Sequence, residues 1–276
     1  LKMFNQLEII SEEQIKKLNN LRKFLRNLKT ACIAYSGGVD STLVATIAFE
    51  QLRNQSLAIT GVSAALASQL LNEARLQAKW IGIKHIEIET FELEDESYSN
   101  NPKERCFACK RELHKHTTII SQKLNYKHVL DGVNLDDLGD YRPGINAAKD
   151  AGVISPLAIL KFSKQDIRDI SKSLCLPWWD KPAQPCLSSR FPYGYEITQK
   201  RLKMIEEAEE YIKNFGIKEV RVRCQGTSAR IEIPKDEIKT FINLYNRDEL
   251  IKFFFKLGFK SASLDLEGLV SGKLNR

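Results

Sequence analysis

The chain has 276 residues, which is enough for one large domain or two modest ones. Its 43% hydrophobic and 28% charged residues, with 14 glycines and 8 prolines, exclude a fibrous chain, a disordered chain and a small disulfide-held scaffold. The net charge of +7 favours an anionic partner, but the basic residues lack the dense clustering of a dedicated nucleic-acid binder. No window approaches the ~18 consecutive apolar residues of a membrane helix, and no export signal opens the sequence. We therefore expect a cytoplasmic protein without a membrane partner.

Six cysteines are spread along the chain. Because thiols stay reduced in the cytoplasm, we expect these side chains to be buried, catalytic or metal-binding rather than paired in disulfides. Three of them, Cys32, Cys175 and Cys224, stand alone in the sequence and are predicted to be packing residues. The other three lie in motifs that carry chemistry.

The first two thirds of the chain alternate between helical and strand patterns. Ser11 and Gln14 form a capping box at the start of a helix that runs to about Leu28. Strands are then predicted over residues 30–35, 56–63, 85–90 and 128–131, and helices over residues 41–52, 67–81, 106–124 and 163–173. Strands separated by helices of about 10–15 residues are typical of βαβ units on a parallel sheet. The sequence therefore predicts an α/β fold with a doubly wound parallel sheet.

A connection rich in proline and tryptophan covers residues 176–192, and we place a domain boundary there, between residues 1–187 and 188–276. Beyond it, a charged helix is predicted over residues 198–215, followed by strands over 219–224 and 229–233 that a hairpin turn at 225–228 joins. A helical stretch and a last strand over residues 262–266 follow. These elements predict a smaller α+β domain at the C-terminal end.

The first predicted strand is followed by Ser36-Gly37-Gly38-Val39-Asp40-Ser41, which opens a helix. Free N–H groups at the helix start form an anion site together with the helix dipole, and the two glycines allow a ligand to approach closely. Ser36 and Ser41 add hydroxyl donors. The loop lacks the lysine of the common phosphate loop GxxxxGK(S/T), and it resembles instead the SGGxDS loop of the N-type ATP pyrophosphatases.

That resemblance implies a sheet of the pyrophosphate-loop ATPase type. It also implies a reaction in which ATP is split into AMP and pyrophosphate to adenylate a carbonyl or a carboxylate. Loop residues Ser36, Gly37, Gly38, Asp40 and Ser41 would bind ATP with its Mg²⁺. Members of this superfamily share the chemistry but differ in the acceptor, so the loop predicts a reaction type and not a pathway. A glycine-rich turn that binds nothing is the alternative.

Cys106 and Cys109 are three residues apart at a predicted helix start, which places both sulfurs on one face of the helix. The neighbouring basic residues Arg105, Lys110 and Arg111 favour the thiolate form of these cysteines. The spacing indicates a pair that can act on one ligand.

Cys186, in the later segment Pro185-Cys186-Leu187, is the third candidate thiolate. Three interpretations are open from the spacing. The three cysteines could hold a [4Fe–4S] cluster and leave one iron without a protein ligand. Alternatively, His114 or His116 could complete a structural zinc site, or the thiols could be unrelated.

The sequence resembles the LarE family of sulfur transferases over nearly its whole length. The segments that carry the resemblance are AYSGGVDSTL (34–43), NPKERCFACK (101–110), LDGVNLDDLGDYRPG (130–144), KPAQPCLSSRFPYG (181–194) and RVRCQGTSARIEIP (221–234). The resemblance implies that a carboxylate of a pyridinium dicarboxylate mononucleotide is adenylated with ATP and converted to a thiocarboxylate, for the nickel-pincer cofactor of lactate racemase. Residues 1–187 would bind ATP and adenylate the substrate. Residues 188–276 would bind the substrate and support assembly into a homo-oligomer.

The cysteine pattern also distinguishes subtypes of this family. Members that sacrifice one cysteine carry it at the position of Pro185 and lack the paired cysteines. The three cysteines therefore match the subtype with a [4Fe–4S] cluster, and this favours the cluster over zinc. Cys186 would be both a cluster ligand and a catalytic residue. The transferred sulfur would come from sulfide or from a persulfide donor.

Two single arginines are candidate binding residues. Arg142 follows the fourth predicted strand, at the sheet edge where ligands bind, and would neutralise ATP phosphates or pair with neighbouring aspartates. Arg190 follows Cys186 by four residues and would contact the anionic substrate or the cluster.

Arg221 and Arg223 alternate along a predicted strand, so both project from one face. Two adjacent guanidiniums repel each other unless an anion lies between them, and arginine is well suited to phosphate. The resemblance points to the phosphate of the substrate nucleotide, whereas a salt-bridged surface strand is the alternative. Glu209 lies in an acidic helical run, and the resemblance alone marks it as a catalytic residue.

Three other functions match parts of this pattern. A tRNA-thiolating pyrophosphate-loop enzyme is the nearest alternative, but the chain shows no paired zinc-ribbon motifs and no added basic domain. An amidotransferase-type synthetase would need an N-terminal cysteine and a glutaminase domain. A nucleotide-binding regulator would need the phosphate loop without the cysteines. We therefore expect small-molecule nucleotide partners rather than nucleic acid.

Overall fold

The structure is a computed structural model of the chain, and it describes residues 9–139, 143–244, 246–270 and 273. It divides into two compact units. The first comprises Leu1–Glu92 and Glu104–Gln184, and the second comprises Leu93–Lys103 and Pro185–Arg276. The two functional domains, divided after residue 187, stay a prediction.

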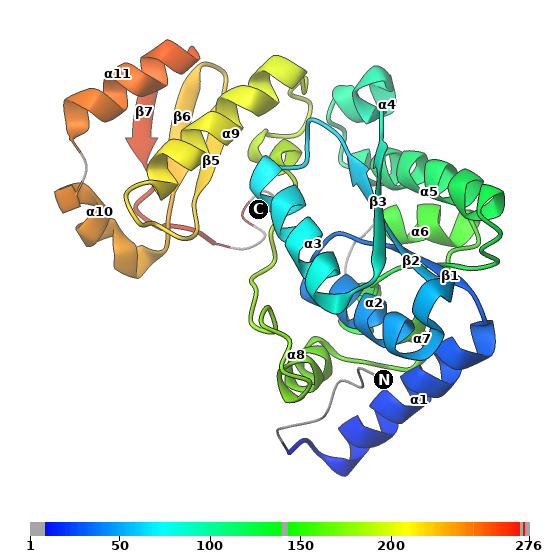
Figure 1. Cartoon of the computed structure of the whole chain (residues 1–276). Helices are drawn as coiled ribbons and strands as arrows, with labels where there is room; N and C mark the ends of the chain where they lie inside the picture. Colours follow the sequence, from blue (N-terminus) through cyan, green and yellow to red (C-terminus); the bar gives the residue numbers. More distant parts are fainter. Residues whose placement is uncertain (1–8, 140–142, 245, 271–272, 274–276) are drawn as a thin grey trace. The chain divides into compact units, whose positions relative to one another are not determined.

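The first unit is built on a four-stranded parallel sheet with the order β3-β2-β1-β4 (Figure 1). Its strands are β1 (Ala31–Ala34), β2 (Ser56–Val62), β3 (Lys84–Glu89) and β4 (Val129–Leu130). The chain proceeds from β1 to β3 in one direction and then returns to place β4 on the other side of β1. This reversal confirms the predicted doubly wound parallel sheet.

Seven helices of this unit are described. They are α1 (Glu12–Leu28), α2 (Val39–Leu52), α3 (Ser68–Ile81), α5 (Arg105–Lys123), α6 (Pro143–Asp150), α7 (Pro156–Ile159) and α8 (Lys164–Ser173). The predicted capping box is present at α1, where Ser11 Oγ accepts from the Gln14 N–H at 3.2 Å and Gln14 Oε1 accepts from the Ser11 N–H at 3.1 Å. The short helices α6 and α7 were not predicted, because four to eight residues are too few for a clear apolar period.

Both faces of the sheet are covered (Figure 1). On one face, Ile33 of β1 and Ala58 of β2 belong to a core that also contains buried residues of α1, α2, α3 and α8. On the other face, Cys32 and Leu57 pack with Leu113 of α5. Because side chains alternate along a strand, this two-sided burial explains the continuous apolar runs in the sequence. Each fully buried aliphatic side chain contributes about 1.5–3 kcal/mol.

The isolated cysteines have different environments. Cys32 and Cys224 are completely buried, which confirms the predicted packing role for both. The prediction is wrong for Cys175, which is exposed. This residue follows the C-cap of α8 with a φ of 55°, so the chain turns there and the thiol faces solvent.

The second unit is an α+β arrangement around a three-stranded sheet with the order β5-β6-β7. Its elements are α4 (Glu96–Ser99), α9 (Gln199–Lys213), β5 (Arg221–Gln225), β6 (Ser228–Glu232), α10 (Ile238–Leu244), α11 (Arg247–Leu257) and β7 (Ser261–Leu264). The predicted hairpin is present, since β5 and β6 are antiparallel and Gly226 has a φ of 64° in the turn between them. β7 adds in parallel to β6, and α9 packs against β5. The predicted fold class is confirmed.

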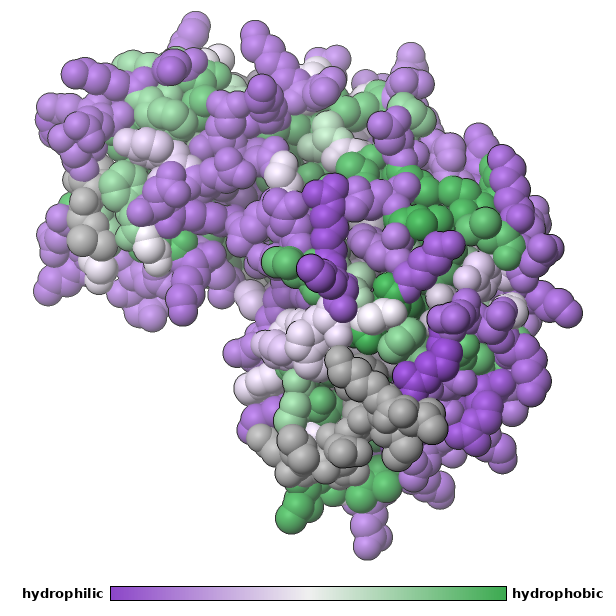
Figure 2. Space-filling view, in the orientation of Figure 1, coloured by the Kyte–Doolittle hydropathy of each residue, from purple (hydrophilic) through white to green (hydrophobic). Residues whose placement is uncertain are grey.

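Two further features are the apolar character of the helices and the hydropathy of the surface. Within the part of the chain that the structure describes, no helix combines the length and the apolar character needed to cross a bilayer. Figure 2 shows hydrophilic side chains over most of the face in view, with hydrophobic side chains gathered in smaller patches.

Candidate functional site

The loop between β1 and α2 has the geometry of an anion site. Gly38 is the N-cap of α2, with an extended backbone and no side-chain hydrogen bond to the first turn. Gly37 has a φ of 68°, and a Cβ on it would lie 3.0 Å from the Cβ of Ala74. The glycine therefore allows both the left-handed turn and the close packing of α3, and the N–H groups of the first turn of α2 are left for a ligand.

Two hydroxyl groups of the loop are brought together. Ser41 Oγ accepts from the Ser36 N–H at 3.3 Å and lies 3.1 Å from Ser36 Oγ. Ser41 Oγ also donates to the Gly38 carbonyl at 3.2 Å, and the Gly38 N–H donates to Ser36 Oγ at 3.3 Å. These weak internal bonds hold the turn and can be exchanged for stronger bonds to a charged ligand.

A buried neutral network supports the loop from below. Tyr35 Oη donates to Gln77 Oε1 at 2.9 Å, and Thr42 Oγ1 donates to the same atom at 3.2 Å. Burial raises the pKa of Tyr35, so its hydroxyl stays a donor. The network fixes the loop without adding a charge that would compete with a ligand.

The turn that follows β4 packs directly against the loop. A Cβ on Gly132 would lie 2.7 Å from the backbone nitrogen of Ser41, which only glycine avoids at this position. Because β4 lies on the opposite side of β1 from β2, the loop is at the point where the strand order reverses. In open α/β sheets, ligands bind in the crevice at this point.

Charged side chains surround the loop although the loop motif itself has no lysine. Asp40 pairs with Lys164 and accepts from Asn134 Nδ2 at 3.4 Å. Lys181 Nζ donates to the Gly37 carbonyl at 3.1 Å and to the Glu73 carboxylate at 2.6 Å. Sequence reasoning missed both lysines, because they lie far along the chain from the loop. The signal for Lys181 was available, since it opens the segment 181–194, in which only Cys186 and Arg190 were named as site residues.

A buried acid and a basic residue of α5 lie at the end of β4. Burial raises the pKa of Asp131, while hydrogen bonds from Ser155 and the Val133 N–H and the charge of Lys110 oppose this effect. Lys110 of α5 is therefore close enough to Asp131 for its charge to act on that carboxyl group. Arg142, predicted to neutralise ATP phosphates at this edge, lies outside the described residues.

The cysteine pair lies in the first turns of α5, as the spacing predicted. Cys106 is exposed and Cys109 is half-buried, whereas burial raises the pKa of the Cys32 thiol to about 12. The thiols of the pair are thus accessible to a soft metal or a sulfur donor, unlike the thiol in the core.

The two histidines of α5 differ in their surroundings. His114 is buried with an unpartnered Nδ1, and burial lowers its pKa to about 3. His116 Nε2 lies 2.8 Å from Glu112 Oε1. Across residues 9–139, 143–244, 246–270 and 273, no three side chains of His, Cys, Asp and Glu are gathered as metal ligands.

The remaining predicted cysteine lies in the second unit. Cys186 is half-buried and precedes a 3₁₀ helix, η4 (Leu187–Arg190). Its carbonyl accepts from Ser189 Oγ at 2.9 Å and from Arg190 Nη1 at 3.2 Å. The assembly of Cys186 with the pair on α5 stays a prediction.

A buried ion pair joins η4 to α9. Arg190 donates to Glu209 through Nε at 2.8 Å and through Nη2 at 3.0 Å. Glu209 also accepts from the Val222 N–H of β5 at 3.0 Å. Because both side chains are less than 10% exposed, removing one partner of such a pair costs about 3–5 kcal/mol.

The arginines of the hairpin lie close to this pair. Arg223 donates to Glu232 Oε2 at 3.0 Å and to the Ser189 carbonyl at 2.7 Å. Burial lowers the pKa of Arg221, and the positive charges of Arg190 and Arg223 lower it further. The guanidiniums of Arg190, Arg221 and Arg223 are therefore close enough to influence one another, and the ion pair of Arg223 with Glu232 matches part of the salt-bridged alternative. The phosphate contact of Arg221 and Arg223 stays a prediction.

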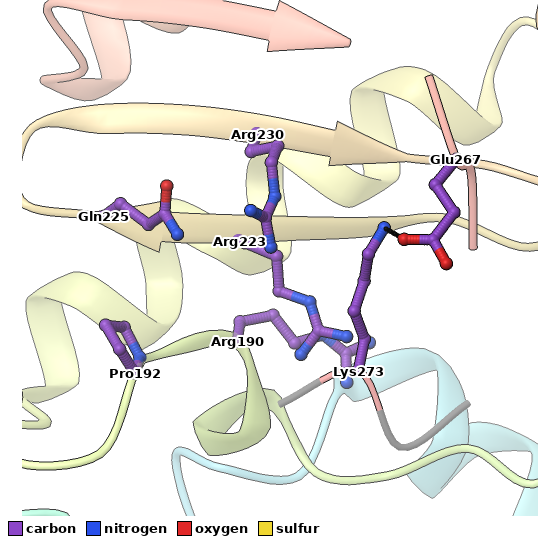
Figure 3. A pocket seen from close by; sticks show the side chains of 7 residues that line it. All are labelled: Arg190, Pro192, Arg223, Gln225, Arg230, Glu267 and Lys273. Carbon is purple, nitrogen blue, oxygen red and sulfur yellow. Dashed lines mark ion pairs between the residues drawn. The ribbon is translucent and has the colours of Figure 1, made fainter. Parts of the chain in front are cut away.

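Arg190 and Arg223 border a pocket of about 310 Å³, whereas Arg221 is not among the described residues that line it. It is lined by Arg190, Pro192, Arg223, Gln225, Arg230, Glu267 and Lys273 (Figure 3). Arg190 arrives from η4, whereas Arg223 and Arg230 come from opposite strands of the hairpin, where they are directly paired (Figure 3). Arg230 and Lys273 were not predicted, because strand pairing and the return of the C-terminal segment bring them here. Four basic side chains and one acid therefore line the pocket.

Each of the four basic side chains of the pocket pairs with a carboxylate. Glu232 is fully buried and lies 3.1 Å from Arg230 Nη2 as well as 3.0 Å from Arg223 Nε. Lys273 Nζ pairs with Asp265 at 2.8 Å and with Glu267 at 3.2 Å. These carboxylates hold the cations in place before a ligand binds.

Comparison with known proteins extends over both units. No protein-family model matches the chain. An uncharacterized protein of Synechocystis sp. is 52% identical over 260 residues, covering 94% of this chain and 97% of that protein. The pyridinium-3,5-bisthiocarboxylic acid mononucleotide synthase of Lactiplantibacillus plantarum, a LarE-type protein, is 34% identical over 253 residues, covering 91% of each chain. The chain belongs to the LarE family.

A third relative is similar to the chain over nearly the whole length of both proteins. An uncharacterized protein of Methanocaldococcus jannaschii is 36% identical over 261 residues, covering 94% of this chain and 98% of that protein.

Proposed function

We propose that this LarE-family chain is an ATP-dependent sulfur transferase. It adenylates a carboxylate of a pyridinium dicarboxylate mononucleotide and converts it to a thiocarboxylate for the nickel-pincer cofactor of lactate racemase. The observation that carries the proposal is the lysine-free loop at the reversal of the sheet, in a chain 34% identical to a pyridinium-3,5-bisthiocarboxylic acid mononucleotide synthase. We place this activity in the cytoplasm, in a homo-oligomer without a membrane or RNA partner.

ATP binds at the loop in this proposal. The N–H groups of Gly37, Gly38 and the first turn of α2 face the pyrophosphate portion, and Ser36 and Ser41 donate through their hydroxyls. Donors fixed before the reaction stabilise the charge that develops on the departing pyrophosphate. Each charge-assisted bond of this kind contributes about 1.5–3 kcal/mol. Asp40 offers a carboxylate oxygen, the ligand type that Mg²⁺ prefers, and Arg142 adds a positive charge.

The acceptor's phosphate binds to Arg221 and Arg223, with Arg190 as a further contact. The pocket beside them suits a phosphate monoester, since its volume of about 310 Å³ and its four cations match a small dianion. Glu209 acts through Arg190, because both of its oxygens receive hydrogen bonds from that guanidinium. Glu209 is therefore a positioning residue for the catalytic step.

The acceptor carboxylate attacks the α-phosphorus of ATP, and pyrophosphate leaves. A sulfur nucleophile then attacks the acyl carbon of the adenylate, and AMP leaves with the original carboxylate oxygen. The result is one thiocarboxylate for each ATP cleaved. The sulfur enters as sulfide. A persulfide donor would deliver this sulfide when a second thiol attacks its S–S bond, which forms a disulfide and releases H₂S.

Cys106, Cys109 and Cys186 would hold a [4Fe–4S] cluster. The donor chemistry fits, because these are three accessible thiols outside the cores that contain Cys32 and Cys224. When bound, the cluster would supply one iron without a protein ligand, at which sulfide can be carried. The basic residues next to the pair favour the thiolate forms that such binding needs.

The proposal is tested by product analysis under anaerobic conditions. The purified chain is supplied with ATP, Mg²⁺, sulfide and pyridinium-3,5-dicarboxylic acid mononucleotide, and the products are separated and weighed. We expect AMP, pyrophosphate and a product in which sulfur replaces oxygen, over several turnovers. Formation of ADP and phosphate would contradict the proposal. Thiolation of added tRNA in place of the mononucleotide would support the tRNA-modifying alternative instead.

A further inference from the structure

Lys181 is a basic side chain that contacts the backbone of the phosphate loop, whereas Lys164 contacts the Asp40 side chain. Its Nζ donates to the carbonyl of Gly37 at 3.1 Å and to the carboxylate of Glu73 at 2.6 Å. The side chain is 12% exposed, so most of its stem is packed. Fixing a lysine in this way costs side-chain entropy, which argues that its position serves the loop.

A triphosphate bound at the loop requires a positive charge that the loop itself does not provide. The loop contributes the acidic side chain of Asp40, and that carboxylate is paired with Lys164. A bound triphosphate adds several negative charges at the same place. Common phosphate loops meet this charge with a lysine inside the motif, and the sequence Ser36–Ser41 has none. The compensating ammonium must therefore come from another part of the chain.

Lys181 has the position that this role requires. The Gly37 carbonyl to which it donates belongs to the glycine pair whose N–H groups form the anion site. Its acidic partner, Glu73, comes from α3 and not from the loop, and its side chain is 30% exposed. A lysine held by a partly solvated carboxylate can change partner through side-chain rotation alone, because the ammonium is a compact charge on a flexible stem.

We infer that Lys181 binds the β- and γ-phosphates of ATP, and that Glu73 holds its ammonium at the loop until the nucleotide arrives. On binding, Nζ exchanges the Glu73 carboxylate for phosphate oxygens, and it then neutralises the departing pyrophosphate. The inference rests on the proposed function only in taking ATP as the ligand of the loop.

Binding measurements on the full chain test this role without any acceptor or metal cluster. Dissociation constants for ATP, pyrophosphate and AMP are measured by calorimetry with Mg²⁺ for the wild type, Lys181→Ala, Lys181→Arg and Glu73→Gln. Lys79→Ala, an exposed lysine of α3, is the matched control.

We expect Lys181→Ala to raise the dissociation constants of ATP and pyrophosphate about tenfold or more, as the loss of one charge-assisted contact predicts. The value for AMP should stay within about twofold of the wild type, since AMP lacks the two phosphates that Lys181 contacts. Lys181→Arg should recover part of the affinity. Glu73→Gln should lower the ATP dissociation constant, because the ammonium no longer has to leave a carboxylate.

Three outcomes would overturn the inference. Unchanged ATP binding by Lys181→Ala excludes the contact, and an equal loss for ATP and AMP indicates a structural role only. A wild-type chain that binds neither ATP nor pyrophosphate contradicts the ATP chemistry of the proposed function itself and the inference with it. The first two outcomes leave the proposed function standing.

Discussion

Gly132 is the residue through which the turn after β4 approaches the phosphate loop, and its replacement by alanine gives a sharp test of that packing. The added Cβ would lie 2.7 Å from the nitrogen and 3.0 Å from the Cα of Ser41, and 3.1 Å from the carbonyl carbon of Asp40. All three atoms are backbone, so no side-chain rotation relieves the clash. The loop or the turn must move.

The size of the effect follows from the geometry. Overpacking against backbone costs about 1–3 kcal/mol, which corresponds to a fall in melting temperature of about 2–4 °C per kcal/mol. Movement of the Ser41 N–H also displaces a donor of the anion site, so the ATP dissociation constant should rise together with the loss of stability.

Gly139→Ala is the matched control, because a Cβ on Gly139 meets nothing within 4 Å. It should be neutral, or stabilising by about 0.4–1 kcal/mol, because alanine restricts the unfolded chain. Thermal unfolding and ATP calorimetry on both variants give the comparison. If Gly132→Ala behaves like Gly139→Ala in both assays, the close approach of the turn to the loop is refuted.

Three further predictions concern the other parts of the site. Replacing Arg221 and Arg223 together by alanine should raise the acceptor KM at least tenfold, because the lost charge-assisted contacts face only the acceptor phosphate. The ATP dissociation constant should stay within about twofold of the wild type, and an equal loss of affinity for acceptor and ATP would reject the assignment. Replacing Cys106, Cys109 or Cys186 singly by serine should abolish the retention of iron and sulfide after anaerobic purification. The control variant Cys175→Ser should retain both. Stoichiometric zinc in a colourless wild-type protein would contradict the cluster assignment. The pKa of His114 is about 3 in the folded chain, against 6.5 in the unfolded chain. As the pH falls below 6.5, the unfolded chain therefore binds a proton that the folded chain does not, and the free energy of unfolding decreases between pH 6.5 and 3. In urea unfolding, the slope should approach about 1.4 kcal/mol per pH unit. His114→Gln should remove this part of the pH dependence, and an unchanged profile would show that His114 is not its source.

The sequence predicted the local features of the fold well, because each rests on neighbouring residues. The capping box at Ser11 and the glycine loop after β1 are written in a few consecutive positions, and both have the expected geometry. The alternation of strands and helices gave the parallel sheet because buried strands and amphipathic helices differ in period. Helices α6 and α7 were missed because short elements have no such period.

Features that depend on distant parts of the chain could not be predicted in the same way. Lys181 meets Gly37, and Arg230 faces Arg223, only because the fold returns the chain to these places. Burial was also misjudged at Cys175, where a left-handed turn after α8 exposes the thiol. Residue type and spacing thus indicate the chemistry of a site, whereas its charge balance depends on the tertiary structure.

The central claim is that the acceptor carboxylate is activated by adenylation. The most direct measurement uses pyridinium-3,5-dicarboxylic acid mononucleotide labelled with ¹⁸O in its carboxylates, together with ATP, Mg²⁺ and sulfide, and determines the mass of the AMP formed. The account predicts AMP that carries one ¹⁸O atom, because the attacking carboxylate oxygen stays on the α-phosphorus when sulfur displaces AMP. Unlabelled AMP formed alongside the thiocarboxylate, or label found in pyrophosphate, would contradict it.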